Sequence, residues 1–160
     1  MSSNRTDDNL HVALVEPDIP WNTGNVGRTA LAVGARLHLV HPLGFDLDER
    51  AVRRAGLDYW RHVDLQEWPE WSTFEATLPS FDHVWMFSAE ASTSFWDVEM
   101  SGRVALIFGS ETTGLRPEIR STHADRLVHI PMTDHPAIRS LNLSTAAALA
   151  MYEFRRRVQP

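Results

Sequence analysis

The sequence predicts a single α/β domain in which a mostly parallel β-sheet has helices on both faces. Apolar, β-prone segments alternate with segments of helical periodicity along the chain of 160 residues, and that alternation is typical of a parallel sheet. The length suits one domain with a real hydrophobic core. A hydrophobic fraction of 43% and a charged fraction of 22% are ordinary for a globular protein.

Five apolar segments are predicted to form the strands of this sheet. Every residue of Val104–Phe108 is apolar, as expected for a strand that is buried on both faces. The first strand ends before Pro17, because proline cannot lie inside a central strand. In chain order the predicted strands are Leu10–Val15, Arg36–Val40, Val84–Phe87, Val104–Phe108 and Leu127–Ile130.

Capping residues and helical spacing predict the helices between these strands. The first helix is expected to begin at Asn22 or Thr23, either of which can cap it, and to end at Gly34. Ser88–Glu99 is expected to be a loop. The other predicted helices are one through Val52 and Ala55 that Asp46 or Asp48 caps, Trp68–Leu78 with Pro69 at its start, Arg116–Ser121, and Asn142–Val158.

The ends and the composition of the chain limit the classes of protein to consider. Residues 1–9 are polar and carry no apolar stretch, so we expect a loose tail without a secretory signal, followed by one domain over residues 10–160. No apolar run reaches the roughly 20 residues that span a bilayer. The chain has no cysteine, which excludes disulfides, thiolate catalysis and zinc–thiolate sites and fits a cytoplasmic location.

The charge composition bears on nucleic-acid binding in two ways. A net charge of −6 argues against a nucleic-acid partner, because phosphate contacts favour basic side chains. All 15 basic residues are arginine, however, and arginine binds phosphate through planar, bidentate contacts. The arginines form two groups, one between Arg50 and Arg61 and one at Arg155–Arg157. Solvated faces of helices explain such groups as well as phosphate binding does.

Several common active-site motifs are absent from the sequence. Without lysine there is no Walker A loop, and Gly24–Gly27 does not meet the dinucleotide-binding fingerprint. Phe108–Glu111 is not a nucleophile elbow. The eight histidines form no HExxH motif or close ligand pair on a helix, so we expect no metal site.

Three polar, glycine-containing segments follow predicted strands, and the carboxyl ends of parallel strands are where such sheets bind ligands. Asn22–Arg28 places amides, a hydroxyl and a guanidinium at a helix start, where free N–H groups attract anions. Gly109–Leu115 follows the most buried strand, and Ile130–Ser144 leads into the last helix. Each segment alone is compatible with a cap or a turn, but together they indicate a ligand pocket.

These segments resemble the three motifs of the SpoU branch of the SPOUT RNA methyltransferases. The branch has an Asn-rich helix start ending in Arg, a Phe-Gly-x-Glu-x-x-Gly-Leu loop, and a Pro-Met segment followed by Ser-Leu-Asn-x-Ser; here these are Asn22–Arg28, Phe108–Leu115 and Ile130–Ser144. The resemblance covers Leu10 to Arg157 and is strongest to the minimal members that act on wobble position 34 of tRNA. Gly27, Ser110 and Trp21 depart from the usual motif residues.

The resemblance implies a fold, a donor and partners. It implies a deep trefoil knot in the C-terminal half, which chain physics alone would not favour, and a homodimer with a shared RNA site. The implied methyl donor is S-adenosyl-L-methionine, bound near Phe87, Gly109, Ile130 and Ser140. The implied substrate is the 2′-hydroxyl of nucleotide 34, cytidine or uridine, in the tRNA anticodon stem-loop. The open alternatives are another tRNA or rRNA position, a non-catalytic knotted RNA-binding protein, and an unrelated nucleotide-binding module.

The resemblance also assigns roles to individual residues. Arg28 would activate the 2′-hydroxyl. Because an arginine side chain does not give up its proton in proteins, we expect Arg28 to bind phosphate or stabilise the developing alkoxide rather than to act as a base. Asn142 would orient the ribose or the donor, Ser140 would bind either, and Glu111 would hold the loop or Arg28. The RNA-binding residues are expected to be Asn22, Asn25, Arg53, Arg54 and Tyr59, with a core or dimer role the alternative for Tyr59.

Overall fold

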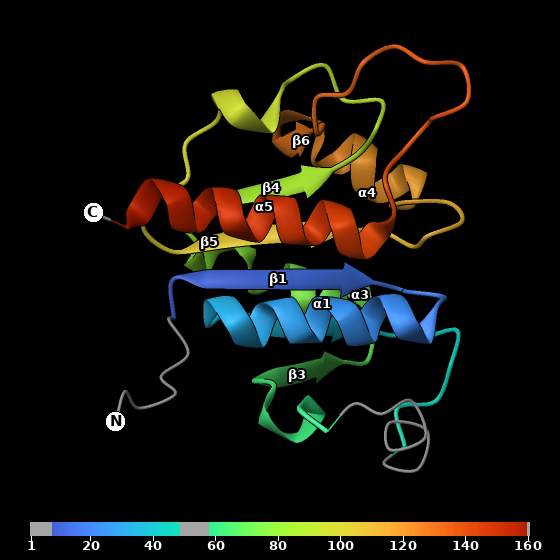
Figure 1. Ribbon diagram of the computed structural model, residues 1–160, viewed down its shortest axis with the longest axis vertical. Helices are drawn as coiled ribbons and strands as arrows, with labels where there is room; N and C mark the ends of the chain where they lie inside the picture. The colour runs from blue at the N-terminus through green and yellow to red at the C-terminus, as the bar shows by residue number, and fades with distance from the viewer. Residues whose placement is uncertain (1–7, 49–57, 160) are drawn as a thin grey trace.

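The computed structural model describes residues 8–48 and 58–159 and shows an α/β domain built on one parallel sheet. The described strands are ordered β3-β2-β1-β5-β4-β6, and every neighbouring pair is parallel. Figure 1 shows the strands running in the same direction across the molecule. The strands are β1 Leu10–Val15, β2 Arg36–Val40, β3 Leu65–Trp68, β4 His83–Phe87, β5 Val104–Phe108 and β6 Leu127–Val128.

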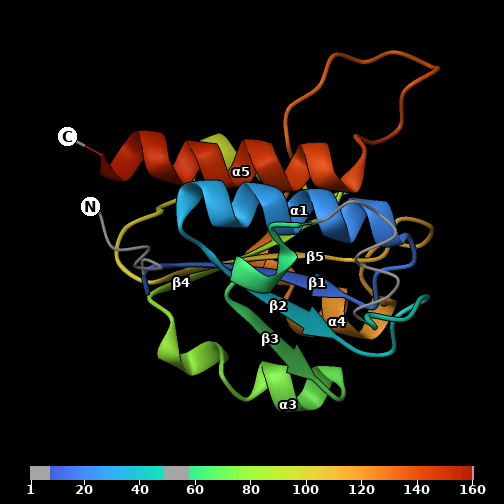
Figure 2. The same ribbon diagram turned by 60° about the horizontal axis from the view of Figure 1, so that its bottom comes forward.

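Helices cover both faces of the sheet, as the sequence predicts. Helices α1 (Pro20–Val33) and α5 (Leu143–Val158) lie side by side on one face, and α3 (Trp71–Glu75) and α4 (Pro117–Thr122) lie on the other (Figure 2). Four short 3-10 turns complete the described elements: Trp60–His62, Leu78–Ser80, Phe95–Asp97 and Ala124–Arg126.

The central strand β1 divides the core between these two layers. All six of its residues are buried, and because side chains alternate along a strand, Leu10, Val12 and Leu14 face α1 and α5 whereas Ala13 and Val15 face α3 and α4. Small residues on α1 and α5, such as Ala30, Ala147 and Ala150, are fully buried in the first layer. The two helices can therefore pack closely on the sheet and on each other.

Three predicted element boundaries are wrong, and each error has a local cause. The predicted helix Trp68–Leu78 is instead the end of β3, the short α3 and a 3-10 turn. Strand β3 lies at the edge of the sheet, so its exposed Gln66 and Glu67 hide the apolar signal of a strand. The last strand stops at Val128, and His129 forms only a bridge to Ser94.

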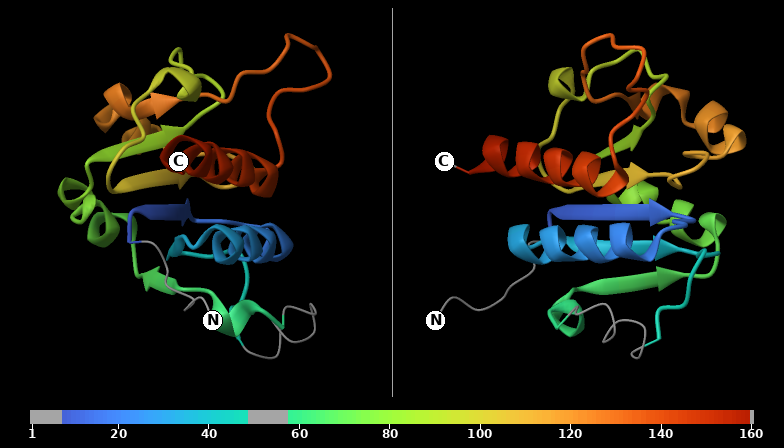
Figure 3. Two further views of the ribbon diagram at one scale, coloured as in Figure 1. Left: turned by 60° about the vertical axis from the view of Figure 1, so that its left-hand side comes forward. Right: turned by 45° about the vertical axis from the view of Figure 1, so that its right-hand side comes forward.

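The third error concerns the start of the first helix. Neither Asn22 nor Thr23 caps it, because α1 begins at Pro20 with Ile19 as its N-cap, and both polar residues are buried inside the helix. The predicted helix through Val52 and Ala55, together with Arg50, Arg53 and Arg54, lies outside the described residues. Loop Ser88–Glu99 contains one 3-10 turn, and the long segment between β6 and α5 extends away from the sheet (Figure 3).

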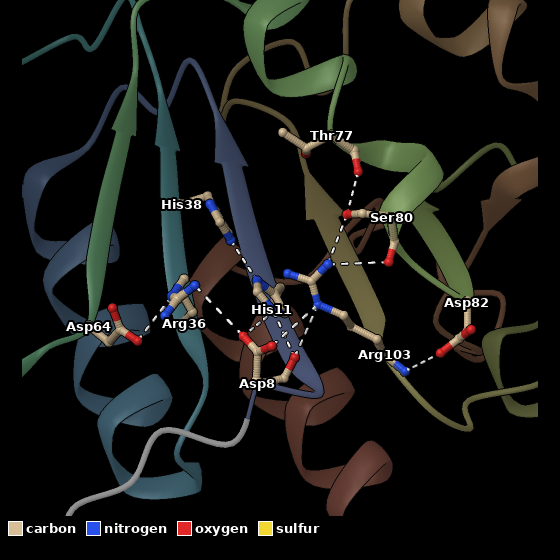
Figure 4. Close-up of polar contacts among 9 residues, drawn as sticks. All are labelled: Asp8, His11, Arg36, His38, Asp64, Thr77, Ser80, Asp82 and Arg103. Atoms are coloured by element: carbon tan, nitrogen blue, oxygen red, sulfur yellow. Dashed lines mark hydrogen bonds and ion pairs between the residues drawn. The ribbon is translucent and has the colours of Figure 1, made fainter.

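A buried hydrogen-bond chain crosses the α3-side face of the sheet towards the amino end of β1. Trp68 Nε1 donates to His38 Nδ1 at 3.0 Å, and His38 Nε2 lies 2.8 Å from His11 Nδ1. His11 Nε2 lies 3.0 Å from the Asp8 carbonyl (Figure 4). Because the indole can only donate and the carbonyl can only accept, His38 must carry its proton on Nε2 and His11 on Nε2. Both imidazoles are therefore neutral in the folded chain.

Candidate active site

A cavity of about 510 Å³ lies at the carboxyl ends of β1, β4, β5 and β6, where the sequence predicts a ligand site. Its wall is formed by Ile19 and Asn22 after β1, by residues 87–90 after β4, and by residues 108–115 at and after β5. The rest of the lining comes from Ile130 and Met132 after β6 and from the segment from Ser140 to Leu143. Its volume lies within the range of small-molecule sites.

The structure brings most of the predicted site residues to this one cavity. The four positions expected to contact a methyl donor all line it, and so do three of the expected catalytic or RNA-contacting side chains. These residues come from segments that are up to 120 positions apart in the chain, and they are Phe87, Gly109, Ile130, Ser140, Glu111, Asn142 and Asn22.

A hydrogen-bonded chain of side chains joins the three predicted motifs. Asn22 Nδ2 donates to Glu111 Oε1 at 3.3 Å, and Asn142 Nδ2 donates to Asn22 Oδ1 at 3.1 Å. The Asn142 Oδ1 atom in turn caps α5, accepting from the Ser144 N–H at 2.9 Å. An ionised carboxylate only accepts hydrogen bonds, so Glu111 fixes the orientation of both amides. The second N–H of Asn142 is left for a ligand in the cavity.

Glu111 also explains why α1 begins where it does. Its carboxylate accepts hydrogen bonds from the backbone N–H groups of Asp18 at 2.7 Å and Ile19 at 3.2 Å. A helix start has unpaired N–H groups and a partial positive charge, which a carboxylate stabilises. Glu111 therefore holds the loop before α1, which is one of the two roles expected for it, and among the described residues it makes no contact with Arg28.

The Gly109–Leu115 loop is tightly closed on itself. The Gly114 N–H donates to the Ser110 carbonyl at 2.9 Å, and the Ser110 hydroxyl lies 2.8 Å from that of Thr113. Gly114 has a φ of 68°, a left-handed conformation that glycine adopts without a steric penalty. Thr112 Oγ1 donates to Asp18 Oδ2 at 2.6 Å. Together with the bonds of Glu111, this is a second hydrogen-bonded link between the loop and the segment before α1.

We expect Glu111→Gln to lower the melting temperature by about 4–8 °C. In the glutamine variant an NH₂ group replaces one acceptor oxygen and faces backbone N–H groups that then lack an acceptor. This lowers the unfolding free energy by roughly 2 kcal/mol, which corresponds to that change in melting temperature for a chain of this size. Thermal unfolding followed by circular dichroism measures the change. The matched control is Glu99→Gln at an exposed position; equal melting temperatures for the two variants would show that Glu111 does not brace the loop.

Three of the remaining predicted residues, Asn25, Arg28 and Tyr59, lie on or beside α1 and do not line the cavity. Arg28 and Asn25 are exposed, and the Arg28 guanidinium carbon lies 5.6 Å from the centre of the Tyr59 ring. The Tyr59 hydroxyl donates to the Gly24 carbonyl at 2.9 Å. Burial raises the pKa of the Tyr59 phenol, while the charge of Arg28 acts in the opposite direction. Arg53 and Arg54 lie outside the described residues.

Sequence reasoning missed a charged pair in the cavity wall. Arg120 Nη1 donates to Glu90 Oε2 at 3.0 Å, and both residues line the cavity. They come from α4 and from the loop after β4, and no motif links those segments in the sequence. Only a contact prediction could have joined positions that are 30 residues apart.

Two further observations concern metals and membranes. Across residues 8–48 and 58–159, no group of three or more potential metal-ligating side chains is placed to hold an ion. None of the described helices is long and apolar enough to cross a membrane.

Comparison with known proteins points to one family. The sequence model of the SpoU rRNA Methylase family matches residues 9–152. A tRNA (cytidine(34)-2'-O)-methyltransferase from Acidovorax sp. (strain JS42) is 41% identical over 147 residues, which cover 90% of this chain and 89% of that protein.

Solved structures show the same architecture. One that concerns the 2-OH methylation of C/U34 on tRNA has a TM-score of 0.85 at 42% identity, covering 94% of this chain and 91% of that chain. The SpoU methyltransferase AviRb from Streptomyces viridochromogenes, in complex with the cofactor AdoMet, has a TM-score of 0.77 at 25% identity. That alignment covers 96% of this chain and 59% of AviRb.

Proposed function

The chain belongs to the SpoU rRNA methylase family, and on that premise we propose that it transfers a methyl group from S-adenosyl-L-methionine to the ribose 2′-hydroxyl of nucleotide 34, cytidine or uridine, in the tRNA anticodon loop. The observation that carries the proposal is the convergence of all three motifs on one cavity through Glu111, Asn22 and Asn142. The relative from Acidovorax, named for the same nucleotide, supports the choice of substrate.

The cavity residues fit S-adenosyl-L-methionine. Apolar side chains of Phe87, Phe108 and Ile130 in the lining suit an adenine ring. Gly109 lets the backbone of Gly114 and Leu115 approach so closely that a Cβ would collide with it, and this close approach shapes the cavity wall. Ser140 and the second N–H of Asn142 supply hydrogen-bonding groups in the same lining. The bound donor supplies an electrophilic methyl group on a sulfonium. The likeness to AviRb, whose structure holds AdoMet, supports this choice of donor.

The chain's own groups position the ribose rather than provide a strong base. A guanidinium does not act as a base in proteins, so the task of Arg28 is to bind the phosphate next to the reacting ribose or to stabilise negative charge developing on the 2′-oxygen. Asn142 orients the ribose or the donor through its remaining N–H group. Glu111 maintains both amide orientations, and Ser140 binds the donor or the substrate. The hydroxyl must come within roughly 3–3.5 Å of the methyl carbon in line with the sulfonium.

The RNA is expected to approach along the exposed side of α1. Asn25 and Arg28 are exposed there, and Asn22 lies at the cavity edge. Arg53 and Arg54, which lie outside the described residues, remain proposed RNA contacts. Because the net charge is −6, a local group of arginines must provide the phosphate contacts that the chain as a whole does not favour.

The proposal includes the architecture that the family implies. We expect a trefoil knot in the C-terminal half, where the segment between β6 and α5 reaches the cavity through Ser140 and Leu141. We also expect a homodimer, since Arg28 lies outside the cavity of its own chain and a partner subunit can bring the RNA surface to the donor. A tRNA substrate places the protein in the cytoplasm.

The test is methyl transfer by the purified protein to tRNA, mapped by nucleoside mass spectrometry. We expect one 2′-O-methyl group at position 34, and none on a matched tRNA with a 2′-deoxyribose there. Arg28→Lys should slow turnover by roughly tenfold or more, since lysine lacks the planar fork that binds phosphate. A methyl group at another nucleotide would support the alternative substrate, and donor binding without transfer would support a non-catalytic role.

A further inference from the structure

Tyr59 and Trp60 contact α1 at Arg28 and in the helical turn before it. The Tyr59 hydroxyl bonds to the Gly24 carbonyl, one helical turn before Arg28, and its ring lies beneath the guanidinium. Trp60 packs against Gly27 so closely that a Cβ there would fall 2.4 Å from the indole ring. Three separate contacts therefore fix the helix turn that carries Arg28.

We propose that Tyr59 is a positioning residue, which holds the Arg28 guanidinium over its ring so that the N–H groups face the RNA. This inference rests on the proposed function, because it gives Arg28 a task in the transfer. It replaces the expectation that Tyr59 stacks on an RNA base. The two roles differ in what Tyr59 affects, since a positioning residue changes the rate of transfer and a stacking residue changes the affinity for tRNA.

An aromatic ring suits this task because it attracts a cation without neutralising it. The face of a tyrosine ring carries partial negative charge but no oxygen that accepts the guanidinium hydrogens. A carboxylate in the same place would occupy those N–H groups and compete with the phosphate. In the described part of the chain no acidic side chain pairs with Arg28, whereas six other arginines have such a partner: Arg36, Arg103, Arg116, Arg120, Arg156 and Arg157.

The contacts of Tyr59 leave little of it for stacking on a base. Its hydroxyl is taken by the Gly24 carbonyl, and one face of its ring is taken by Arg28. The side chain is half-buried, whereas bases stack on aromatic rings that are open on a face. The hydroxyl bond also anchors the far end of the side chain, which keeps the ring beneath the guanidinium.

The first test uses the unmodified protein. In an NMR spectrum of the full chain, the Arg28 side-chain protons should be shifted upfield by the ring current of Tyr59, and Arg28→Lys identifies the signals. Tyr59→Leu should return these signals to the positions usual for an exposed arginine. Unshifted signals in the unmodified protein would overturn the proposal, whatever the variants do.

The second test separates transfer from binding. We expect Tyr59→Leu to lower the single-turnover rate by roughly tenfold to a hundredfold, as for the loss of a positioning contact, while the affinity for tRNA changes by less than about threefold. Tyr59→Phe keeps the ring and should recover most of the rate. The control is Trp96→Leu, an exposed aromatic residue on a different element, which should leave both quantities unchanged.

The outcomes distinguish this inference from the proposed function. A wild-type protein that transfers no methyl group to tRNA would defeat the proposed function. An active wild-type protein with an equally active Tyr59→Leu variant would defeat only the role of Tyr59, as would a variant that loses tRNA affinity at an unchanged rate. Equal melting temperatures of the variants and the wild type exclude misfolding as the cause of a lower rate.

Discussion

Gly109→Ala is expected to weaken binding of S-adenosylhomocysteine by at least about a hundredfold and to destabilise the fold by on the order of 3 kcal/mol or more. A Cβ at this position would fall 2.1 Å from both the Gly114 carbonyl carbon and the Leu115 nitrogen. Those atoms belong to the backbone and cannot rotate away as a side chain can. The loop must open, and the cavity wall that it forms is lost with it. Calorimetric titration and thermal unfolding measure the two effects.

Gly114→Ala is the matched control in the same loop. Gly114 has a φ of 68°, but no atom lies within 4 Å of a Cβ added there. The substitution therefore introduces only backbone strain, which costs roughly 1–2 kcal/mol, without a collision. If Gly109→Ala bound the ligand within about threefold of the wild type, the close approach of the two loop backbones would not matter for the site.

The second large effect is a loss of stability in mild acid. Burial lowers the pKa of His38 from 6.5 to about 3 and also lowers the pKa of His11. Below pH 6.5 the unfolded chain therefore binds protons at these histidines that the folded chain does not bind. The unfolding free energy is unaffected above pH 6.5 and decreases as the pH falls towards the folded pKa values. Between pH 6 and 5 we expect His38 to remove up to about 1.4 kcal/mol of the unfolding free energy per pH unit, and protonation of His11 in the unfolded chain to add to this loss.

The surroundings of the two histidines oppose protonation. Their facing nitrogens lie 2.8 Å apart, so a second proton would place two N–H groups against each other. The charges of Arg36 and Arg103 also disfavour a charged imidazole, although the Asp8 carboxylate favours one at His11. Figure 4 shows these groups gathered around the amino end of β1.

Urea unfolding at a series of pH values measures this dependence. His38→Gln is the informative variant, because glutamine can accept from Trp68 and donate to His11 without titrating. We expect it to remove the part of the slope that His38 contributes between pH 6 and 5. An identical slope in the variant and the wild type would show that His38 is not responsible.

The strands and the position of the site could be predicted from local sequence, whereas its internal contacts could not. Val104–Phe108 is apolar throughout and forms β5 with its predicted bounds. The α1 start was misplaced because its stabilising carboxylate, Glu111, lies 93 residues from Asp18. Asn142 was recognisable as a helix cap, but its bond to Asn22 spans 120 residues. Patterns of hydrophobicity and capping carry no information at such separations.

The edge of the sheet shows a second limit. Strand β3 has two exposed polar residues among its four, so its apolar pattern is too short to identify. Its place beside β2 rests on pairing over four positions, which depends on the whole sheet. Tyr59 was predicted to meet RNA because aromatic side chains often do, and its contacts with Gly24 and Arg28 became apparent only in the folded chain.

The contact between Gly27 and Trp60 has a consequence for how the sequence can change during evolution. The indole occupies the space that a side chain at position 27 would need, so neither position can vary freely. A relative with an apolar residue at the position of Gly27 should carry a smaller residue at the position of Trp60, and the pair should change together. Tryptophan at one position thus restricts the other to glycine, even though glycine weakens a helix by about 1 kcal/mol relative to alanine.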